Sequence, residues 1–285
     1  MKNNSNISVT IGIPSYNEKK YIKKTIESAL NQSYSNISIV VSDNNSNDGT
    51  VNFLKKNYKD RIVIYEHKKN IGMNENFKFL AEKANSKYFM WLGAHDYIHE
   101  KYVEEAINVH ENHSICSLVY FQHQFVNNMY ENIETIPLNS IVSTEKKRYK
   151  NAINLFQNLN YCTHIHGIWR LKDKNKIIPY FMNIVGPDHL ILFIFSLIGE
   201  IKSIEKKYYF RLEKRNENYD QRFERYKKLN FKFDSSDPKY SMLENHFNYL
   251  LKNFYLYTFY KLFKSEKGRG KKYIKQKFKL IFNVF

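Results

Sequence analysis

The first hundred residues alternate four times between a short apolar run and a segment whose apolar residues have helical spacing. Short runs rich in β-branched residues are typical of buried strands, and apolar residues three or four positions apart indicate a helix packed on one face. Strands that alternate with helices form parallel sheets with right-handed crossovers. We therefore predict an α/β fold with a doubly wound, mostly parallel sheet. The expected strands are residues 7–14, 37–43, 61–67 and 87–93, and the expected helices are residues 18–32, 50–58 and 74–84.

The alternation weakens after residue 100. A chain of 285 residues is long enough for one large domain with an appendage. We expect a domain over residues 1–215, in halves 1–110 and 111–215, followed by a basic, aromatic-rich helical extension over 216–285. After residue 100, helices are expected at 101–110 and 188–199, strands at 115–126 and 204–212, and a polar loop at 127–150.

Polar clusters follow three of the predicted strands, namely "PSYNE" (14–18), "DNNSNDG" (43–49) and "AHD" (94–96). In doubly wound sheets ligands bind outside the carboxyl ends of the strands, so these clusters are expected to open onto one edge. An aromatic ring at this edge can stack on a base, and neighbouring polar groups can hold hydroxyls; simple helix capping explains Ser15 and Asn17 equally well. No G-x-G-x-x-G follows the first strand, which argues against a dinucleotide bound in the usual way.

The formal net charge of +17 restricts partners to negatively charged molecules or surfaces. The most basic segment, residues 264–285, interleaves lysines with apolar residues, as in a basic amphipathic helix on an anionic membrane; a solvated terminal helix is the alternative. The 23 tyrosines are scattered and no RNA- or DNA-binding motif is present, so we expect no nucleic-acid partner.

The compartment is expected to be the cytoplasm, with peripheral attachment to the inner face of the membrane if the basic tail binds lipid. The chain starts without the pattern of a signal peptide, and its longest apolar stretch, residues 190–201, is too short to span a bilayer. The two cysteines, Cys116 and Cys162, have neither metal-binding nor redox spacing, which favours a reducing compartment.

Four segments together resemble the nucleotide-sugar end of the inverting glycosyltransferase family 2, which has the GT-A fold. They are "VTIGIPSYNEKKYIKKTIESALNQSY", "IVVSDNNSNDGT", "NIGMNENF" and "FMWLGAHDYIHEKY", in the family's order and spacing over roughly residues 7–105. "HGIWR" (166–170) and "GPDHLILF" (186–193) stand where the family places acceptor-side motifs. The resemblance makes residues 1–110 a nucleotide-sugar-binding half and 111–215 an acceptor-side half.

The resemblance also implies a donor site for a nucleotide-sugar, most simply a UDP-sugar. Tyr16 would lie against the base, and the second residue of the pair Asp43-Asn44 would read the uracil N3–H. That second residue is usually an aspartate; an asparagine oxygen still accepts from uracil, whereas a flipped amide would suit cytosine. The residues expected to bind the nucleotide-sugar are Pro14, Tyr16, Glu18, Asp43, Asn44, Asn76 and His95.

The segment "LGAHD" matches the place of the family's D-x-D signature, but Gly93 and His95 replace its two aspartates. Asp96 matches an aspartate that often follows and is expected to hold Mg²⁺ or Mn²⁺ at the donor diphosphate. His95 is either a second metal ligand, which would favour Mn²⁺, or a partly protonated donor facing the phosphates. The missing aspartates leave a metal-independent enzyme as the alternative, with basic residues between 204 and 227 as compensating charges.

Asp188 matches the family's candidate general base, which would deprotonate the acceptor hydroxyl. Its position after Gly186 and Pro187 is also that of an ordinary helix cap, and His189 is a second candidate. The resemblance thus predicts a bacterial-type inverting glycosyltransferase acting on a surface glycan such as capsule, lipooligosaccharide or a lipid-linked acceptor. The first alternative is a catalytically silent nucleotide-binding relative, because Asn44, Gly93 and His95 depart from the pattern. The second, less favoured alternative is a nucleic-acid-binding protein, for which the +17 charge and the 23 tyrosines are the motive.

Overall fold

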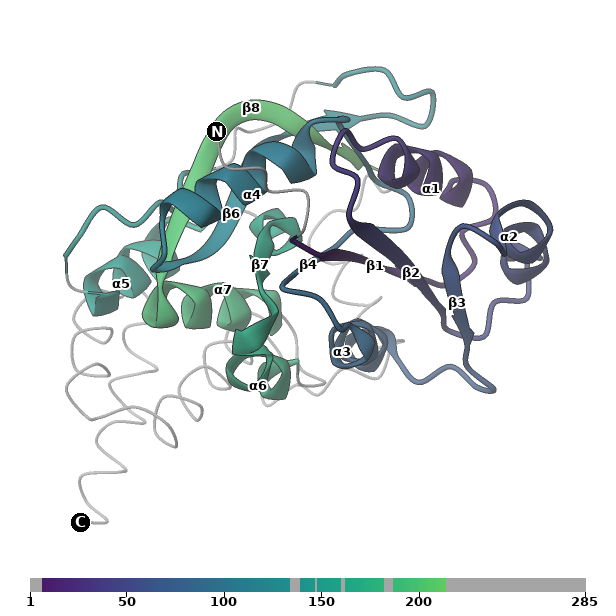
Figure 1. The fold of residues 1–285 in the computed structure, drawn as a ribbon, viewed down its shortest axis with the longest axis horizontal. Coiled ribbons are helices and arrows are strands. Elements are labelled where there is room, and N and C mark those ends of the chain that lie inside the picture. Colours follow the sequence, from purple (N-terminus) through teal and green to yellow (C-terminus); the bar gives the residue numbers. More distant parts are fainter. Residues whose placement is uncertain (1–6, 134–138, 147, 160–161, 182–186, 214–285) are drawn as a thin grey trace, which may run out of the picture.

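The computed structural model describes residues 7–133, 139–146, 148–159, 162–181 and 187–213. Eight strands form one sheet in the order β3-β2-β1-β4-β7-β6-β8-β5, with helices on both faces (Figure 1). The strands are β1 Val9–Ser15, β2 Ile37–Asp43, β3 Val63–Glu66, β4 Tyr88–Trp91, β5 Tyr97–Ile98, β6 Cys116–Val126, β7 Ile168–Arg170 and β8 Glu200–Leu212. The α-helices are α1 Ile22–Leu30, α2 Thr50–Tyr58, α3 Met73–Lys83, α4 Tyr102–Asn112, α5 Arg148–Asn158, α6 Lys174–Ile177 and α7 Pro187–Ile198.

The first four strands form the parallel block that the alternation predicts. β1 pairs in parallel with β2 on one side and β4 on the other, and β2 pairs in parallel with β3. Each of these strands is joined to the next one in the chain through a helix, so the carboxyl ends of β1, β2 and β4 meet at one edge. The predicted doubly wound α/β architecture is confirmed for this block.

The second half of the sheet is mixed. β7 runs antiparallel to both β4 and β6, while the long strands β6 and β8 are parallel and β5 is antiparallel to β8. The strand predicted at 204–212 begins four residues earlier, at Glu200, and the helix α5 begins at Arg148 inside the stretch expected to be loop. The predicted extension over 216–285 lies outside the described residues.

Two apolar clusters cover the two faces of the sheet. The cluster on one face joins α3, α5, α6 and α7 around Trp91 and Trp169, both fully buried. The other joins α1, α2 and α4 around strand residues such as Ile11 and Val41. Burial of apolar area on both faces is the main source of stability for such a sheet. The two layers therefore fix the strand ends on which the polar clusters lie.

Candidate functional site

Three loops meet at the carboxyl ends of β1, β2 and β4. The backbone N–H of Asn17 donates to Ser46 Oγ over 2.8 Å, and that of Glu18 donates to Thr50 Oγ1 over 3.0 Å. The side chain of Glu18 lies 3.0 Å from Nδ1 of His95, which follows β4. The prediction that the three polar clusters open onto one edge is therefore confirmed, and we call this edge the rim.

Tyr16 presents an aromatic ring at the rim. Tyr16 is 48% exposed although it directly follows the buried Ser15 at the end of β1. Asn17 next to it has φ of 57°, a left-handed conformation that asparagine tolerates better than most residues. The Asn17 Oδ1 accepts from the backbone N–H of Asn47, so this side chain secures the loop. Pro14 lies in β1 opposite Ser42 of β2, immediately beneath the rim.

Asp43 and Asn44 are buried at the end of β2, and both order the surrounding loops. The Asp43 carboxylate accepts from the backbone N–H and the hydroxyl of Ser46, over 2.8 and 2.6 Å. The Asn44 Oδ1 accepts from the backbone N–H of Ile71, while its Nδ2 donates to Asn70. A flipped Asn44 amide would lose both bonds, so the fold fixes which end of the amide is the acceptor.

Asn76 lies beneath the rim and has a supporting contact with β2. Its Nδ2 donates to the Ser42 carbonyl over 3.0 Å, and its Oδ1 accepts from the Ser42 hydroxyl over 2.6 Å. The Ser42 hydroxyl also lies 3.0 Å from Nε2 of His67. These bonds tie α3 and the loop before it to β2. The structure thus brings Asn76 close to the other predicted donor residues with its amide occupied by Ser42.

Asp96 is buried, and both of its carboxylate oxygens face β8. Oδ2 accepts from the Tyr209 hydroxyl over 2.7 Å, and Oδ1 accepts from the backbone N–H of Leu212 over 2.9 Å. Burial acts to raise the pKa of Asp96, but the nearby charges of His95, His166 and Arg211 and the Tyr209 hydrogen bond hold it below its ordinary value. The carboxylate therefore anchors β8 to the rim as a charged acceptor.

A divalent cation finds few ligands in this arrangement. His95 Nδ1 faces Glu18, and its Nε2 lies 3.9 Å from Asp96 Oδ1, an oxygen that Leu212 already occupies. Across the described parts of the chain, no group of three or more His, Cys, Asp and Glu side chains is arranged to hold a metal ion. A Cβ added at Gly93 would overlap Asp96 Oδ2, so an aspartate at that signature position would not fit beside Asp96 as it stands. The predicted metal ligands Asp96 and His95 therefore do not form a metal-fitting set, and we derive no step through a metal.

Asp188 lies in the first turn of α7 and is half-buried. Its Oδ1 accepts from the backbone N–H of His189 over 3.1 Å, and it hydrogen-bonds the Cys162 thiol. Cys162 precedes the short 3₁₀ helix Thr163–His166, which contacts both α7 and β4. In that helix His166 Nδ1 lies 3.0 Å from the Trp91 carbonyl at the end of β4. One turn of helix therefore connects the predicted base to the rim.

Tyr209 and Arg211 of β8 are rim residues that the motifs did not identify. The Tyr209 ring is stacked between His123 and His166, with centroid separations of 4.6 and 5.0 Å. Burial lowers the pKa of both histidines, and the positive Arg211 lowers it further. The segment "IEKKYYFRL" predicted a strand here, but its pairing with residues 97–98 has no local signal.

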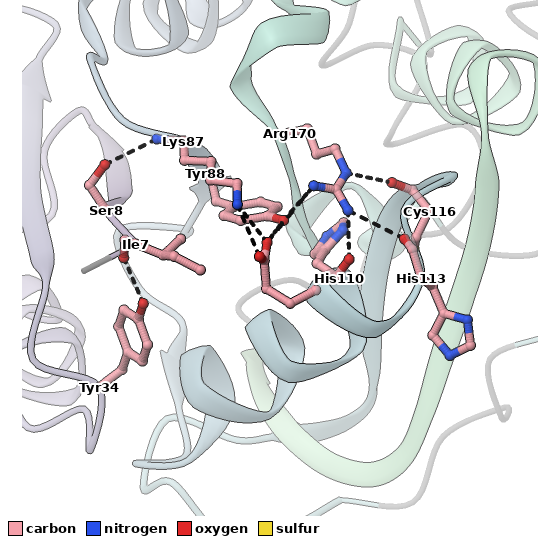
Figure 2. Close-up of polar contacts among 10 residues, drawn as sticks. Ile7, Ser8, Tyr34, Lys87, Tyr88, His110, His113, Cys116 and Arg170 are labelled. Carbon is pink, nitrogen blue, oxygen red and sulfur yellow. Dashed lines mark hydrogen bonds and ion pairs between the residues drawn. The ribbon is translucent and has the colours of Figure 1, made fainter. Parts of the chain in front are cut away.

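A cavity of about 360 Å³ lies at the opposite end of β4, lined by residues 84–87, 170–172 and 174. Figure 2 shows the polar network beside it, in which the Arg170 guanidinium donates to the Cys116, His110 and His113 carbonyls and to the Tyr88 hydroxyl. Lys87 pairs with Glu111 over 2.8 Å. This network joins β7 to α4 and β4, so its charged groups are engaged in holding the fold together.

The described residues include no helix that is both long enough and apolar enough to cross a membrane. The predicted membrane contact of residues 264–285 lies outside that part of the chain.

Comparison with protein families finds one match over more than half of the chain. The model described as "Glycosyl transferase family 2" matches residues 10–174 of the 285. That segment contains the rim loops of β1, β2 and β4 and ends at Lys174, where α6 begins, so it stops short of α7. The family match therefore includes every predicted donor residue but not Asp188.

Several relatives match over part of their length. An uncharacterised glycosyltransferase of Rickettsia bellii is 31% identical over 140 residues, which are 48% of this chain and 20% of that protein. The abequosyltransferase RfbV of Salmonella typhimurium is 33% identical over 93 residues, 31% of this chain and 28% of that protein. A dolichyl N-acetyl-α-D-glucosaminyl phosphate 3-β-D-2,3-diacetamido-2,3-dideoxy-β-D-glucuronosyltransferase of Methanococcus voltae is 32% identical over 112 residues, 36% and 34% of the two chains. The matches span a fifth to a third of these relatives' own lengths.

Solved structures match over most of the chain. Residues 1–349 of S. aureus TarS in complex with UDP-GlcNAc superpose with a TM-score of 0.61 at 16% identity, covering 93% of this chain and 83% of that one. The same fragment in complex with UDP gives a TM-score of 0.56, with coverages of 93% and 82%. At this level of identity the likeness concerns the fold.

Proposed function

Because the chain belongs to glycosyl transferase family 2 and has the GT-A fold, we propose that it transfers a sugar from a UDP-sugar to an acceptor hydroxyl, with inversion at the anomeric carbon. The acceptor in this proposal is a surface glycan, free or lipid-linked. Support for the acceptor class comes from the relatives, since the abequosyltransferase and the Methanococcus voltae transferase named for a dolichyl N-acetyl-α-D-glucosaminyl phosphate match 31% and 36% of this chain.

The observation that carries the proposal is the convergence of three loops at the rim. They place the exposed ring of Tyr16 and the buried pair Asp43 and Asn44 around the carboxyl ends of β1 and β2. Asn44 supports uracil as the base, because its oxygen is held as an acceptor by the backbone N–H of Ile71 and retains a second lone pair. The solved structure with UDP-GlcNAc has the same fold, which supports a UDP-sugar donor.

The transfer requires one bond to break and one to form. The bond between the anomeric carbon and the β-phosphate oxygen breaks, and its electron pair leaves with UDP. The acceptor oxygen attacks the anomeric carbon from the opposite face and gives its proton to a carboxylate. We assign this base to Asp188, which lies half-buried one short helix away from the end of β4.

The proposal is tested by the release of UDP from a panel of UDP-sugars in the presence of glycan acceptors. We expect wild-type turnover and a loss of at least a hundredfold in kcat for Asp188→Asn, since general-base catalysis contributes about 10²–10⁴-fold. Asp60→Asn is the matched control, because Asp60 is an exposed aspartate in the turn between α2 and β3. Unchanged kcat in Asp188→Asn would remove that assignment, with His189→Gln as the next variant to measure.

The second candidate is a relative that binds nucleotide without transfer. The observation that favours it is the absence of the signature aspartates at Gly93 and His95, with the Asp96 carboxylate already occupied by β8. UDP binding without release of UDP from any sugar donor would support it. Measured turnover would exclude it.

Membrane attachment through residues 264–285 remains a prediction from the basic amphipathic pattern. Deletion of this segment is expected to weaken binding to vesicles with anionic lipid, and the weakening should disappear with neutral vesicles. Unchanged binding to anionic vesicles would contradict the prediction.

A further inference from the structure

We propose that Arg211 is the cation that faces the donor diphosphate and that Asp96 is the positioning residue that holds it there. This inference rests on the proposed function, because it concerns how the same donor site handles the charge of a nucleoside diphosphate. It assigns to the chain itself a charge that a bound metal would otherwise supply.

The register of β8 places Arg211 at the rim. β5 and β8 are antiparallel, with Tyr97 opposite Phe210 and Ile98 opposite Tyr209. The same register, extended by one residue, puts Arg211 opposite Asp96. The backbone bond from Leu212 to Asp96 Oδ1, 2.9 Å long, fixes the strand next to Arg211. Sequence neighbours on both sides of Arg211 are therefore locked to the segment that follows β4.

The guanidinium of Arg211 has donors to spare. Within the described residues its contact is with the ring of Phe125, whose centroid lies 5.6 Å from Cζ, and it makes no hydrogen bond or ion pair there. Arg170 is the contrast, because three of its nitrogens donate to carbonyls or to the Tyr88 hydroxyl. Arg170 thus has a structural role, whereas the half-exposed guanidinium of Arg211 has no hydrogen-bond acceptor among the described residues. An open guanidinium fork matches the geometry of phosphate oxygens.

The electrostatics around Arg211 agree with this placement. Burial is the largest influence on the pKa of Asp96 and acts to raise it. The charge of Arg211, with those of the nearby histidines, holds this pKa below its ordinary value. Burial, the largest influence, keeps the pKa of His123 and of His166 below the ordinary value, and the charge of Arg211 acts in the same direction. Arg211 is therefore a positive charge beside two imidazoles for which burial disfavours protonation. It also reaches the other side of the site, since it lowers the pKa of the Cys162 thiol, which burial and Asp188 raise.

The chemistry requires a positive charge at this place. When the anomeric bond breaks, negative charge accumulates on the β-phosphate oxygen of UDP, and an aligned cation stabilises it more in the transition state than in the ground state. The described residues offer no cluster of three metal ligands. An arginine side chain stays positively charged at physiological pH and only donates hydrogen bonds. UDP binding by this chain should consequently persist when divalent cations are removed.

Titration calorimetry with UDP, and with uridine as a ligand without phosphate, tests the inference in buffer with EDTA and in buffer with Mn²⁺. We expect Arg211→Gln to bind UDP about 10- to 100-fold more weakly than wild type while its affinity for uridine is unchanged. Arg211→Lys should recover part of the loss, because it restores the charge without the fork. Lys207→Gln is the matched control, since it removes one positive charge from an exposed position of the same strand and should leave UDP binding intact.

The positioning role of Asp96 is tested with the same pair of ligands. Tyr209→Phe loosens the Asp96 carboxylate without removing a charge, so it should weaken UDP binding more than uridine binding. An equal loss for both ligands would mean a general structural defect and would overturn the positioning role.

Three results would overturn the assignment of Arg211. UDP binding that is lost in EDTA, restored by Mn²⁺ and unchanged in Arg211→Gln would assign the charge to a metal. If Lys207→Gln weakened UDP binding as much as Arg211→Gln, the loss would reflect the net charge of the protein and not a contact made by Arg211. If Arg211→Gln does not fold, an Arg211→Lys variant that binds UDP like wild type in affinity and enthalpy would show that no forked contact is made. Wild-type protein that binds neither UDP nor uridine would instead refute the proposed function on which the inference rests.

Discussion

Replacement of Asp96 should destabilise the fold even when neither nucleotide nor metal is present. Asp96 is 3% exposed, and its carboxylate is the acceptor for the Tyr209 hydroxyl and the Leu212 backbone N–H. Asp96→Ala leaves both donors buried without a partner. Each unsatisfied buried group costs about 1–3 kcal/mol, so we expect a loss of about 2–6 kcal/mol in the free energy of unfolding.

Asp96→Asn should cost less. An asparagine keeps the shape of the side chain, and its oxygen can still accept from Leu212 while its amide donates to a Tyr209 hydroxyl that rotates to accept. What is lost is the contribution of the negative charge to two hydrogen bonds, about 1–2 kcal/mol. The order of stability is therefore wild type, then Asp96→Asn, then Asp96→Ala.

Urea denaturation in EDTA measures this order, and the shift in midpoint multiplied by the slope gives the free-energy difference. Tyr209→Phe combined with each Asp96 variant forms a double-mutant cycle, in which we expect a coupling of about 1–2 kcal/mol. A loss below about 1 kcal/mol for Asp96→Ala in EDTA, with a larger loss only in Mn²⁺, would refute the anchoring role. It would identify Asp96 as a metal ligand, as the motif alone predicts.

Three further predictions concern the rim and the network behind it. Gly93→Asp restores a signature aspartate, but its Cβ would overlap Asp96 Oδ2. We therefore expect it to destabilise the protein by about 1–3 kcal/mol and to create no metal dependence of UDP binding. Mn²⁺-dependent UDP binding by this variant would contradict the geometry. Tyr16→Ala should weaken UDP binding by roughly 1–3 kcal/mol, the contribution of one base stack. Because Tyr16 is 48% exposed, the thermal midpoint of the free variant should stay within about a degree of the wild-type value. Unchanged affinity for UDP would remove Tyr16 from the base pocket. Burial lowers the pKa of His110 to about 4, against about 6.5 in the unfolded chain, so the unfolded state takes up the proton first as the pH falls. About 3 kcal/mol of the stability present above pH 6.5 should therefore be lost between pH 6.5 and 4. The free energy of unfolding of His110→Gln should depend less on pH across this range, and a slope equal to that of wild type would contradict the shift.

The parallel half of the fold follows from the sequence because its signals are local. β2 (Ile37–Asp43) and α2 (Thr50–Tyr58) have the predicted boundaries, since a β-branched run and a turn-rich segment delimit them. The convergence of the loops after β1, β2 and β4 also follows, because parallel strands fix which ends meet. A pattern of this kind determines both the edge and its residues.

The antiparallel half could not be predicted in the same way. β5 and β7 have two and three residues, too few for any periodicity to register. The bond between Asp96 and Tyr209 joins residues 113 apart in the sequence, and only the pairing of β5 with β8 brings them together. For the same reason the motif suggested a metal ligand at Asp96, whereas the structure shows a buried anchor and brings Arg211 to its side.

The measurement that tests the central claim most directly is thermal unfolding of the full chain with UDP, CMP and GDP, each in Mn²⁺, Mg²⁺ and EDTA. A nucleotide present at 100 times its Kd should stabilise the fold by about 2.7 kcal/mol, a shift that a melting curve resolves. Our account predicts a rise in Tm with UDP that exceeds those with CMP and GDP and that persists in EDTA. No rise with any of the three nucleotides would contradict the assignment of the rim as a nucleotide-sugar site.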